Sequence, residues 1–85
     1  MREFEFTVTE TSGIHARPAG HIAARMKQFK AEITIEKSGK KANAKKIFEI
    51  MGLHIQIGDT VRVTVSGEDE ERAFSEAESY LINNF

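Results

Sequence analysis

Apolar and polar residues alternate in three separate segments of this 85-residue chain. Phe4, Phe6 and Val8 are divided by charged or hydroxyl side chains, and the same alternation recurs in residues 32–36 and 61–65. A period of two is typical of a strand that buries one face and exposes the other. The pattern therefore predicts three half-buried strands, of which the valine-rich third is the most regular.

A turn signal follows the second of these strands and predicts a hairpin. Residues 37–40 are Lys-Ser-Gly-Lys, and a shorter segment with a weaker strand pattern follows at 41–43. A glycine-containing turn between two such segments is typical of an antiparallel pair. The hairpin brings the expected number of strands to four.

Three other segments space their apolar residues as helices do. The first begins at about Ala16, and its apolar stripe consists of Ala19, Ile22, Ala23, Met26 and Phe29. The second is a short helix within 45–53 that we expect to end at Gly52. The third follows the acidic residues 68–71, which suit the positive end of a helix dipole. Its apolar stripe consists of Ala73, Phe74, Ala77, Tyr80 and Leu81.

The order of these elements, β-α-β-β-α-β-α, predicts an α+β fold in two layers. Strands with one apolar face and helices with one apolar stripe bury those surfaces against each other. We therefore expect a four-stranded antiparallel sheet with three helices on one face and solvent on the other. With 85 residues, the chain is long enough for one core, so we expect a single domain over residues 1–85.

The composition excludes several classes of function. The chain has no cysteine, which rules out disulfides, thiolate chemistry and a cysteine-based zinc site. His15, His21 and His54 lack the paired spacing of metal ligands, and Ser12 lacks the glycine-flanked turn of a hydrolase nucleophile. Residues 1–9 do not resemble a signal peptide, and no apolar run could span a membrane. We expect a cytoplasmic protein without metal or cofactor.

The net charge of −1 conceals two halves of opposite charge. Residues 15–46 contain nine basic and two acidic residues, whereas residues 47–85 contain two basic and eight acidic residues. A basic half attracts acidic partners and anionic ligands and raises encounter rates. Nucleic-acid binding is the alternative, and it predicts affinity that falls steeply with salt. Aromatic residues are not interleaved with the lysines beyond the single Phe29, which argues against it.

Residues 13–19 place a histidine where an extended segment gives way to a helix. Pro18 suits a first helical turn, because its φ is fixed near the helical value and it has no N–H to leave unpaired. The backbone amides of Ala16 and Arg17 and the helix dipole then form an anion site, to which the Arg17 guanidinium adds a forked cation. His15 lies at the rim of this site, where an oriented neutral imidazole can accept a phosphoryl group.

The short helix predicted within 45–53 is too apolar to bury all its side chains. Its apolar residues are Ile47, Phe48, Ile50 and Met51. Core packing remains the alternative for the two isoleucines, whereas we expect Phe48 and Met51 to form an exposed patch of the kind that binds partners. Lys45 and Lys46 would surround this patch with positive charge, which suits a partner that has carboxylates around an apolar spot.

Taken together, these residues resemble the HPr family, the histidine-containing phosphocarrier proteins of the bacterial phosphoenolpyruvate:sugar phosphotransferase system. The resemblance is carried by residues 13–19, Asn43-Ala44-Lys45, Ile47-Phe48, Leu53 and Gly58, and continues through the last strand and helix. It implies an open-faced β-sandwich of four antiparallel strands and three helices. It also implies that His15 accepts a phosphoryl group on Nδ1 from phosphorylated enzyme I and passes it to the IIA domains of sugar permeases.

The same resemblance implies roles for the surrounding residues. Arg17 would neutralise the phosphate, which the amides of Ala16 and Arg17 also bind. The partner-docking surface would consist of Gly20, Lys45, Lys46, Ile47, Phe48 and Met51. Such a protein carries a phosphoryl group without turnover of its own, so it is not an enzyme, and we expect it to be a monomer.

Four residues depart from the family pattern. Lys46 stands where many relatives of the Gram-positive type have a regulatory serine, and His54 stands where glycine is usual. Gly20 replaces a usual alanine, and Glu49 introduces an acid into the docking surface. His54 could bring a second imidazole close to His15. These departures keep open an alternative, a regulatory paralogue that binds an effector or serves a relay other than sugar transport.

Overall fold

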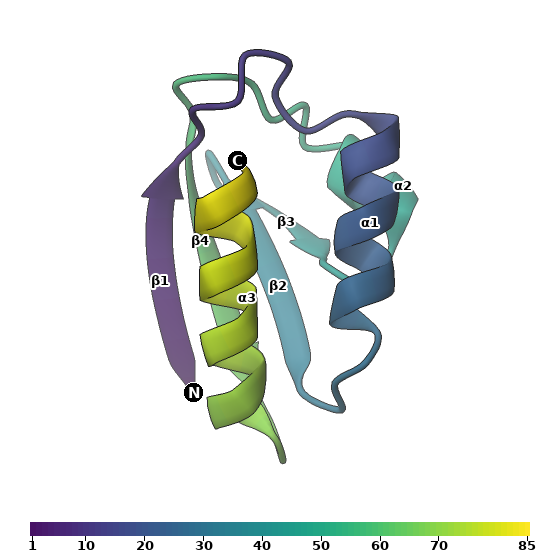
Figure 1. Cartoon of the computed structure of the whole chain (residues 1–85), viewed down its shortest axis with the longest axis vertical. Helices are drawn as coiled ribbons and strands as arrows, with labels where there is room; N and C mark the ends of the chain where they lie inside the picture. The colour runs from purple at the N-terminus through teal and green to yellow at the C-terminus, as the bar shows by residue number, and fades with distance from the viewer.

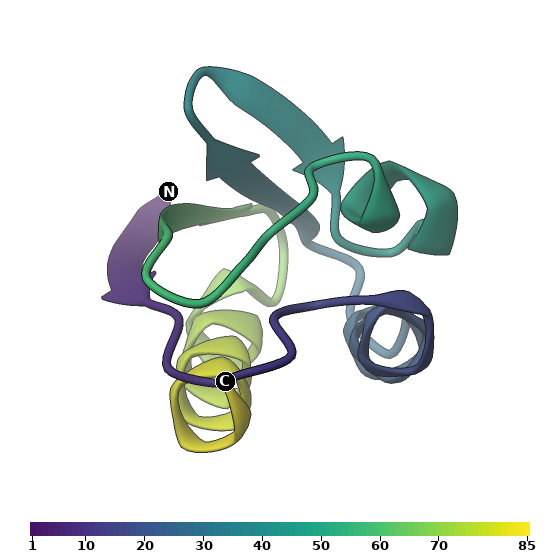
Figure 2. The same ribbon diagram turned by 90° about the horizontal axis from the view of Figure 1, so that it is seen from above.

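The computed structural model describes residues 1–85 and contains the seven expected elements in the expected order. They are β1 (Arg2–Thr7), α1 (Ala16–Met26), β2 (Glu32–Lys37), β3 (Lys40–Asn43), α2 (Ile47–Met51), β4 (Thr60–Ser66) and α3 (Glu70–Asn84). The strands form one antiparallel sheet in the order β1-β4-β2-β3. Figures 1 and 2 show α1 and α3 on the same side of this sheet, with α2 beside α1 at the β3 end. The predicted α+β fold is confirmed.

The buried residues form one entirely apolar core between the sheet and the helices. Val61, Val63 and Val65 of β4 are almost completely buried, whereas Arg62 between them points to solvent. β4 occupies the middle of the sheet because it pairs with β1 on one side and β2 on the other. The clearest alternation in the sequence thus belongs to a central strand, as burial of one face requires.

The acidic residues at the start of α3 do more than complement the helix dipole. The Asp69 carboxylate accepts hydrogen bonds from the backbone amides of Lys30 (2.9 Å) and Ala31 (2.8 Å), which lie just before β2. Glu70 pairs with the amino group of Met1 at 2.8 Å. Asp69 itself makes no side-chain capping bond to α3. The acidic block therefore connects the start of α3 to two segments that are distant in the sequence.

These contacts predict how stability depends on pH. The backbone amides of Lys30 and Ala31 hold the pKa of the Asp69 carboxyl below its usual 3.8, the Lys30 amide contributing most. A pKa lowered by folding gives stability that is complete above the unfolded value and is lost as the pH falls through the folded value. We expect Asp69→Asn to lower the urea midpoint at neutral pH, and the difference from the parent to shrink below pH 3.8.

Urea unfolding at neutral pH and at about pH 2.5 checks this prediction. Glu68→Gln is the matched control, because it removes the same charge from a neighbouring position whose only ion pair, with Lys30, is at the exposed surface. Such pairs contribute little to stability. A difference between parent and Asp69→Asn that is equal at both pH values would contradict the assignment.

Candidate anion site and docking surface

Two loops lie side by side at the end of the sheet that carries the candidate site (Figures 1 and 2). One connects β1 to α1, and the other connects α2 to β4. Val8 donates a backbone hydrogen bond to Asp59 and accepts one from Gly58, both at 2.8 Å, and the Ile14 amide donates to the Ile55 carbonyl at 3.0 Å. The segment that precedes His15 is thus fixed to the second loop.

His15 is the last extended residue before α1, which begins at Ala16 as predicted. Its backbone has φ −113° and ψ −159°, and its carbonyl accepts the first hydrogen bond of the helix, from the Ala19 amide at 2.9 Å. The amides of Ala16 and Arg17 donate to no atom of the chain, and Pro18 has no amide hydrogen to donate. The start of α1 therefore presents two free amides beside an exposed imidazole, an arrangement that binds anions.

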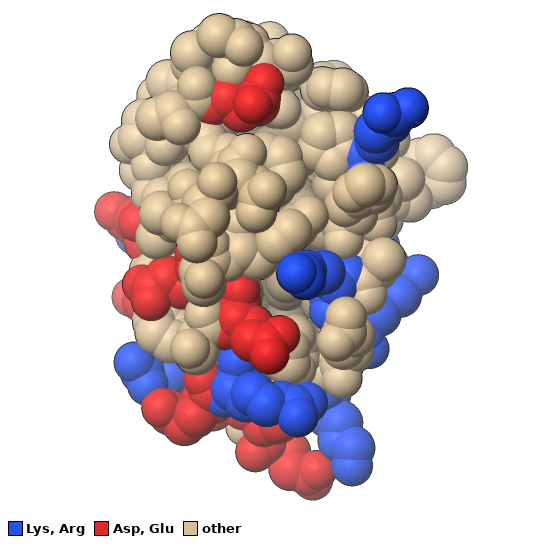
Figure 3. All heavy atoms as spheres, in the orientation of Figure 1, with Lys and Arg blue, Asp and Glu red and all other residues tan.

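The Arg17 side chain adds a free cation to this site. It is exposed and makes neither an ion pair nor a hydrogen bond within the chain. Arg25, two turns further along the exposed face of α1, differs because its guanidinium lies 4.6 Å from the centre of the Tyr80 ring. In Figure 3, most basic side chains gather on the side of α1 and α2, whereas the acidic ones lie mainly over β1 and α3. The predicted division of charge therefore has a spatial counterpart.

One face of the His15 imidazole borders a hollow of about 300 Å³. The hollow is lined by Ser12, Ile14, His15, Met51, His54, Ile55 and Gln56. It therefore contains both His15 and His54, the second imidazole that the sequence suggested, as well as Met51 of the predicted docking surface. Arg17 does not line this hollow.

A partly buried ion pair supports the second loop, and no local pattern indicated it beyond the turn at Gly58. Lys37, at the end of β2, donates to the His54 carbonyl at 2.7 Å and pairs with the Asp59 carboxylate at 2.8 Å. The same carboxylate accepts a bond from the Gln56 amide at 2.8 Å. The Lys37 ammonium, followed by the Gln56 amide, holds the pKa of the Asp59 carboxyl below its usual value.

The predicted docking surface divides into exposed and buried residues. The Phe48 side chain is 80% exposed and Met51 is half-buried, whereas Ile50 is fully buried and Ile47 packs partly against the core. The alternative of core packing therefore holds for Ile50 in full and for Ile47 in part. Gly20 of α1 faces α2, where a Cβ would lie 3.4 Å from Ile47 Cδ1. This distance is an ordinary contact, so the two helices pack closely at Gly20 but leave room for a methyl group.

The two lysines of the predicted surface have different environments. The Lys45 ammonium donates to the Phe29 carbonyl at 2.6 Å and is partly buried, whereas Lys46 is exposed and lies 3.9 Å from the Glu49 carboxylate. Both line a broad hollow beside Phe48 to which Lys27 also contributes. The apolar patch is thus bordered by basic residues, of which Lys45 is held by a carbonyl whereas Lys46 has only the distant Glu49 carboxylate as a partner.

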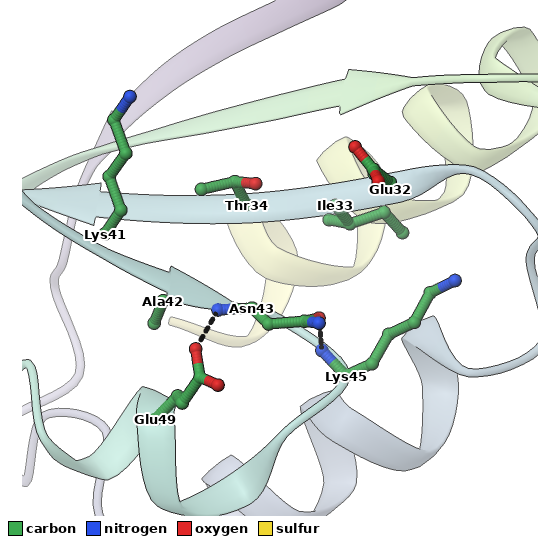
Figure 4. Close-up of a pocket in the computed structure, with 8 residues that line it drawn as sticks. All are labelled: Glu32, Ile33, Thr34, Lys41, Ala42, Asn43, Lys45 and Glu49. Carbon is green, nitrogen blue, oxygen red and sulfur yellow. Dashed lines mark hydrogen bonds between the residues drawn. The ribbon is translucent and has the colours of Figure 1, made fainter.

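Glu49 has a structural role that the sequence did not reveal. Its carboxylate accepts a hydrogen bond from the backbone amide of Asn43 at 2.8 Å, as Figure 4 shows. The Asn43 side chain in turn accepts a bond from the Lys45 amide at 2.9 Å. These two bonds join the end of β3 to α2 and the residues just before it, so the acid that departs from the family pattern holds α2 in place.

The chain has neither a cluster of metal-ligating side chains nor a helix suited to a membrane. No group of three or more His, Cys, Asp or Glu side chains is arranged to hold a metal ion. None of the helices combines the length and the apolar character needed to cross a bilayer.

Comparison with known proteins gives consistent results. The family model described as "PTS HPr component phosphorylation site" matches residues 2–83. The Phosphocarrier protein HPr of Lysinibacillus sphaericus is 40% identical over 74 residues, which cover 87% of this chain and 84% of that protein. The protein of the same name from Xylella fastidiosa is 35% identical over 85 residues, covering 100% and 96%.

Solved structures agree with this comparison. HPr-C-His from Thermoanaerobacter tengcongensis superposes with a TM-score of 0.90 at 34% identity, and the match covers 98% of this chain and 93% of that chain. A structure described as an HPr dimer from the same organism has a TM-score of 0.72 at 37% identity, covering 98% and 94%. Because similar proteins form dimers, the expected monomer stays a prediction.

Proposed function

Since this chain belongs to the HPr family and is a phosphocarrier of the phosphotransferase system, we propose that His15 is the residue on which it carries the phosphoryl group. The observation that supports this assignment most directly is the start of α1. An exposed imidazole stands beside the unpaired amides of Ala16 and Arg17, and the Arg17 guanidinium has no partner within the chain. His21 is exposed too, but it lies within α1, where no free amides surround it.

The proposed transfer uses the lone pair of His15 Nδ1. This nitrogen forms a bond to phosphorus while the donor's bond to phosphorus breaks, and the donor leaves with the electron pair of that bond. The proton of the neutral imidazole stays on Nε2. Negative charge is spread over the three phosphoryl oxygens during the transfer, so positioned donors supply most of the stabilisation. The amides of Ala16 and Arg17 and the Arg17 side chain would supply it here.

The proposal includes the partners of this relay. The donor is phosphorylated enzyme I and the acceptors are IIA domains of sugar permeases, all acting in the cytoplasm. Phe48 and Met51 would dock against them, because Met51 lines the hollow beside His15 and Phe48, on the same short helix, is a large exposed apolar residue. A regulatory paralogue is not favoured as the alternative, since the curated relatives above are named as phosphocarriers.

Phosphorylation with purified components tests the assignment of His15. The protein is incubated with phosphoenolpyruvate and enzyme I, and intact-mass and peptide mass spectrometry at alkaline pH locate the adduct. We expect one acid-labile phosphoryl group on His15, none on His15→Ala, and normal labelling of His21→Ala. Absence of an adduct on the parent, or an adduct that persists in His15→Ala, would overturn the proposal.

Phe48→Ala tests the docking surface separately from the chemistry. Since the Phe48 side chain is 80% exposed, its loss should change the free energy of unfolding by less than about 0.5 kcal/mol. A central apolar anchor of an interface is worth about 2 kcal/mol, so we expect transfer from enzyme I at low concentration to slow about 30-fold. Initial rates of phosphorylation measure this effect.

Ile82→Ala is the matched control for Phe48, because Ile82 is also an exposed apolar residue, 48% accessible, but belongs to α3. It should leave the transfer rate unchanged. Equal rates for the parent and Phe48→Ala would remove Phe48 from the docking surface.

A further inference from the structure

His54 shares with His15 the hollow beside the start of α1. Both side chains are exposed, and no other residue that lines this hollow is a base or an acid. The backbone connects the two positions directly, because the amide of Ile14, which precedes His15, bonds at 3.0 Å to the carbonyl of Ile55, which follows His54. Each of the two loops that line the hollow thus contributes one histidine to it.

The backbone of His54 is held in an uncommon conformation. Its φ of +52° lies in the left-handed region, where a residue other than glycine costs about 1 kcal/mol or more. Its amide donates to the Met51 carbonyl at 3.1 Å, and its carbonyl accepts from the Lys37 ammonium at 2.7 Å. The chain therefore has a histidine at a position that glycine would occupy with less strain. Hydrogen bonds of its amide and its carbonyl hold the backbone there in place.

None of the donors already assigned to the phosphoryl group belongs to the loop between α2 and β4. The amides of Ala16 and Arg17 belong to the start of α1, and Arg17 does not line the hollow. The only ammonium near the second loop, that of Lys37, is engaged with the His54 carbonyl and Asp59. A phosphoryl group adds three acceptor oxygens and close to two negative charges, so an oxygen that faces the hollow needs a further donor.

We propose that the His54 imidazole is this donor: it hydrogen-bonds to the phosphoryl group carried on His15 and holds that group from the side opposite α1. This inference rests on the proposed role of His15. Its consequence concerns the lifetime of the phosphorylated protein. A hydrogen bond that holds the phosphoryl group on His15 in the ground state, and that is lost as the group departs to water, slows this departure.

Two measurements on the phosphorylated full-length protein test the proposal. Phosphorylation of His15 should shift the imidazole resonances of His54 in NMR spectra, whereas the same treatment of His15→Ala should not. Removal of the donor in His54→Gly, a residue that the left-handed backbone accepts, should shorten the half-life of the phosphohistidine at neutral pH about tenfold.

Controls separate this role from a structural one. His54→Asp also tolerates the left-handed conformation and has no donor at neutral pH, so it should fold normally and shorten the half-life as well. His21→Ala removes an exposed imidazole outside the hollow and should have the parent half-life. The role of His54 is refuted, and that of His15 stands, if His15 is phosphorylated but two results are negative: the His54 resonances do not shift on phosphorylation, and both His54 variants have the half-life of the parent. If His15 is not phosphorylated, the proposed function fails instead.

Discussion

Replacing Arg17 with glutamine is expected to slow phosphoryl transfer to His15 about 100-fold, because removal of one preorganised donor at a developing charge has effects of this size. The guanidinium is the only side-chain cation placed at the start of α1 that has no partner within the chain. Nothing in the fold depends on it, so the free energy of unfolding should stay within about 0.5 kcal/mol of the parent value. The loss of rate would therefore arise in the phosphoryl transfer itself and not from a loss of folded protein.

Rapid-quench measurement of phosphorylation at saturating enzyme I separates this step from docking. Arg17→Lys should recover part of the rate, because lysine restores the charge without the forked pair of donors. Arg25→Gln is the matched control, since it removes an arginine from the same exposed face of α1, where the side chain contacts Tyr80. Equal transfer rates for Arg17→Gln and Arg25→Gln would show that Arg17 has no special role.

Gly13→Ala is expected to destabilise the fold by about 3 kcal/mol, for two reasons that act together. The backbone at Gly13 has φ +66°, and a Cβ added there would overlap with the Ile55 carbonyl oxygen. That oxygen accepts the Ile14 amide, so any shift that relieved the overlap would weaken the bond between the two loops. We therefore expect lower stability and slower phosphorylation of His15 in the folded fraction.

Urea unfolding distinguishes the overlap from the backbone strain. Gly39→Ala is the matched control, because Gly39 has φ +83° but no atom within 4 Å of its added Cβ. It should cost only about 1 kcal/mol, the strain of a left-handed alanine. If both variants lose the same free energy of unfolding, the close approach of Gly13 to Ile55 does not contribute to the effect of Gly13→Ala.

The sequence was sufficient for the elements and the core, because both follow from local periodicity. The alternation at 61–65 predicted β4 with its apolar face inward, and the helical stripe from Ala19 to Met26 predicted the buried side of α1. The start of α1 was predictable as well, since Pro18 restricts the backbone by itself. Val8 was placed on the first strand by its pattern; it lies one residue beyond β1 but is buried as expected.

The contacts that shape the candidate site were not predictable, because their partners are distant in the sequence. Nothing near Asp69 indicates that it binds the amides before β2, and nothing near Lys37 indicates the His54 carbonyl. Gly52 was expected to end α2, and it does, but with φ −65° rather than a left-handed value; the left-handed residue is His54. Gly20 lies where α1 and α2 pack closely, and the partner that an added Cβ would contact, Ile47, is also distant in the sequence.

The order of strands in the sheet has a consequence for how the protein is made. β1 pairs only with β4, so residues 2–7 have no strand partner until residues 60–66 have left the ribosome. The loop before His15 depends on segments that are made as late or later, since its hydrogen bonds are to residues 55–59 and to the Phe85 carbonyl. An incomplete nascent chain therefore exposes His15 without the structure around it. The ability to accept a phosphoryl group should appear only after most of the chain has been synthesised, which makes it a test of complete folding.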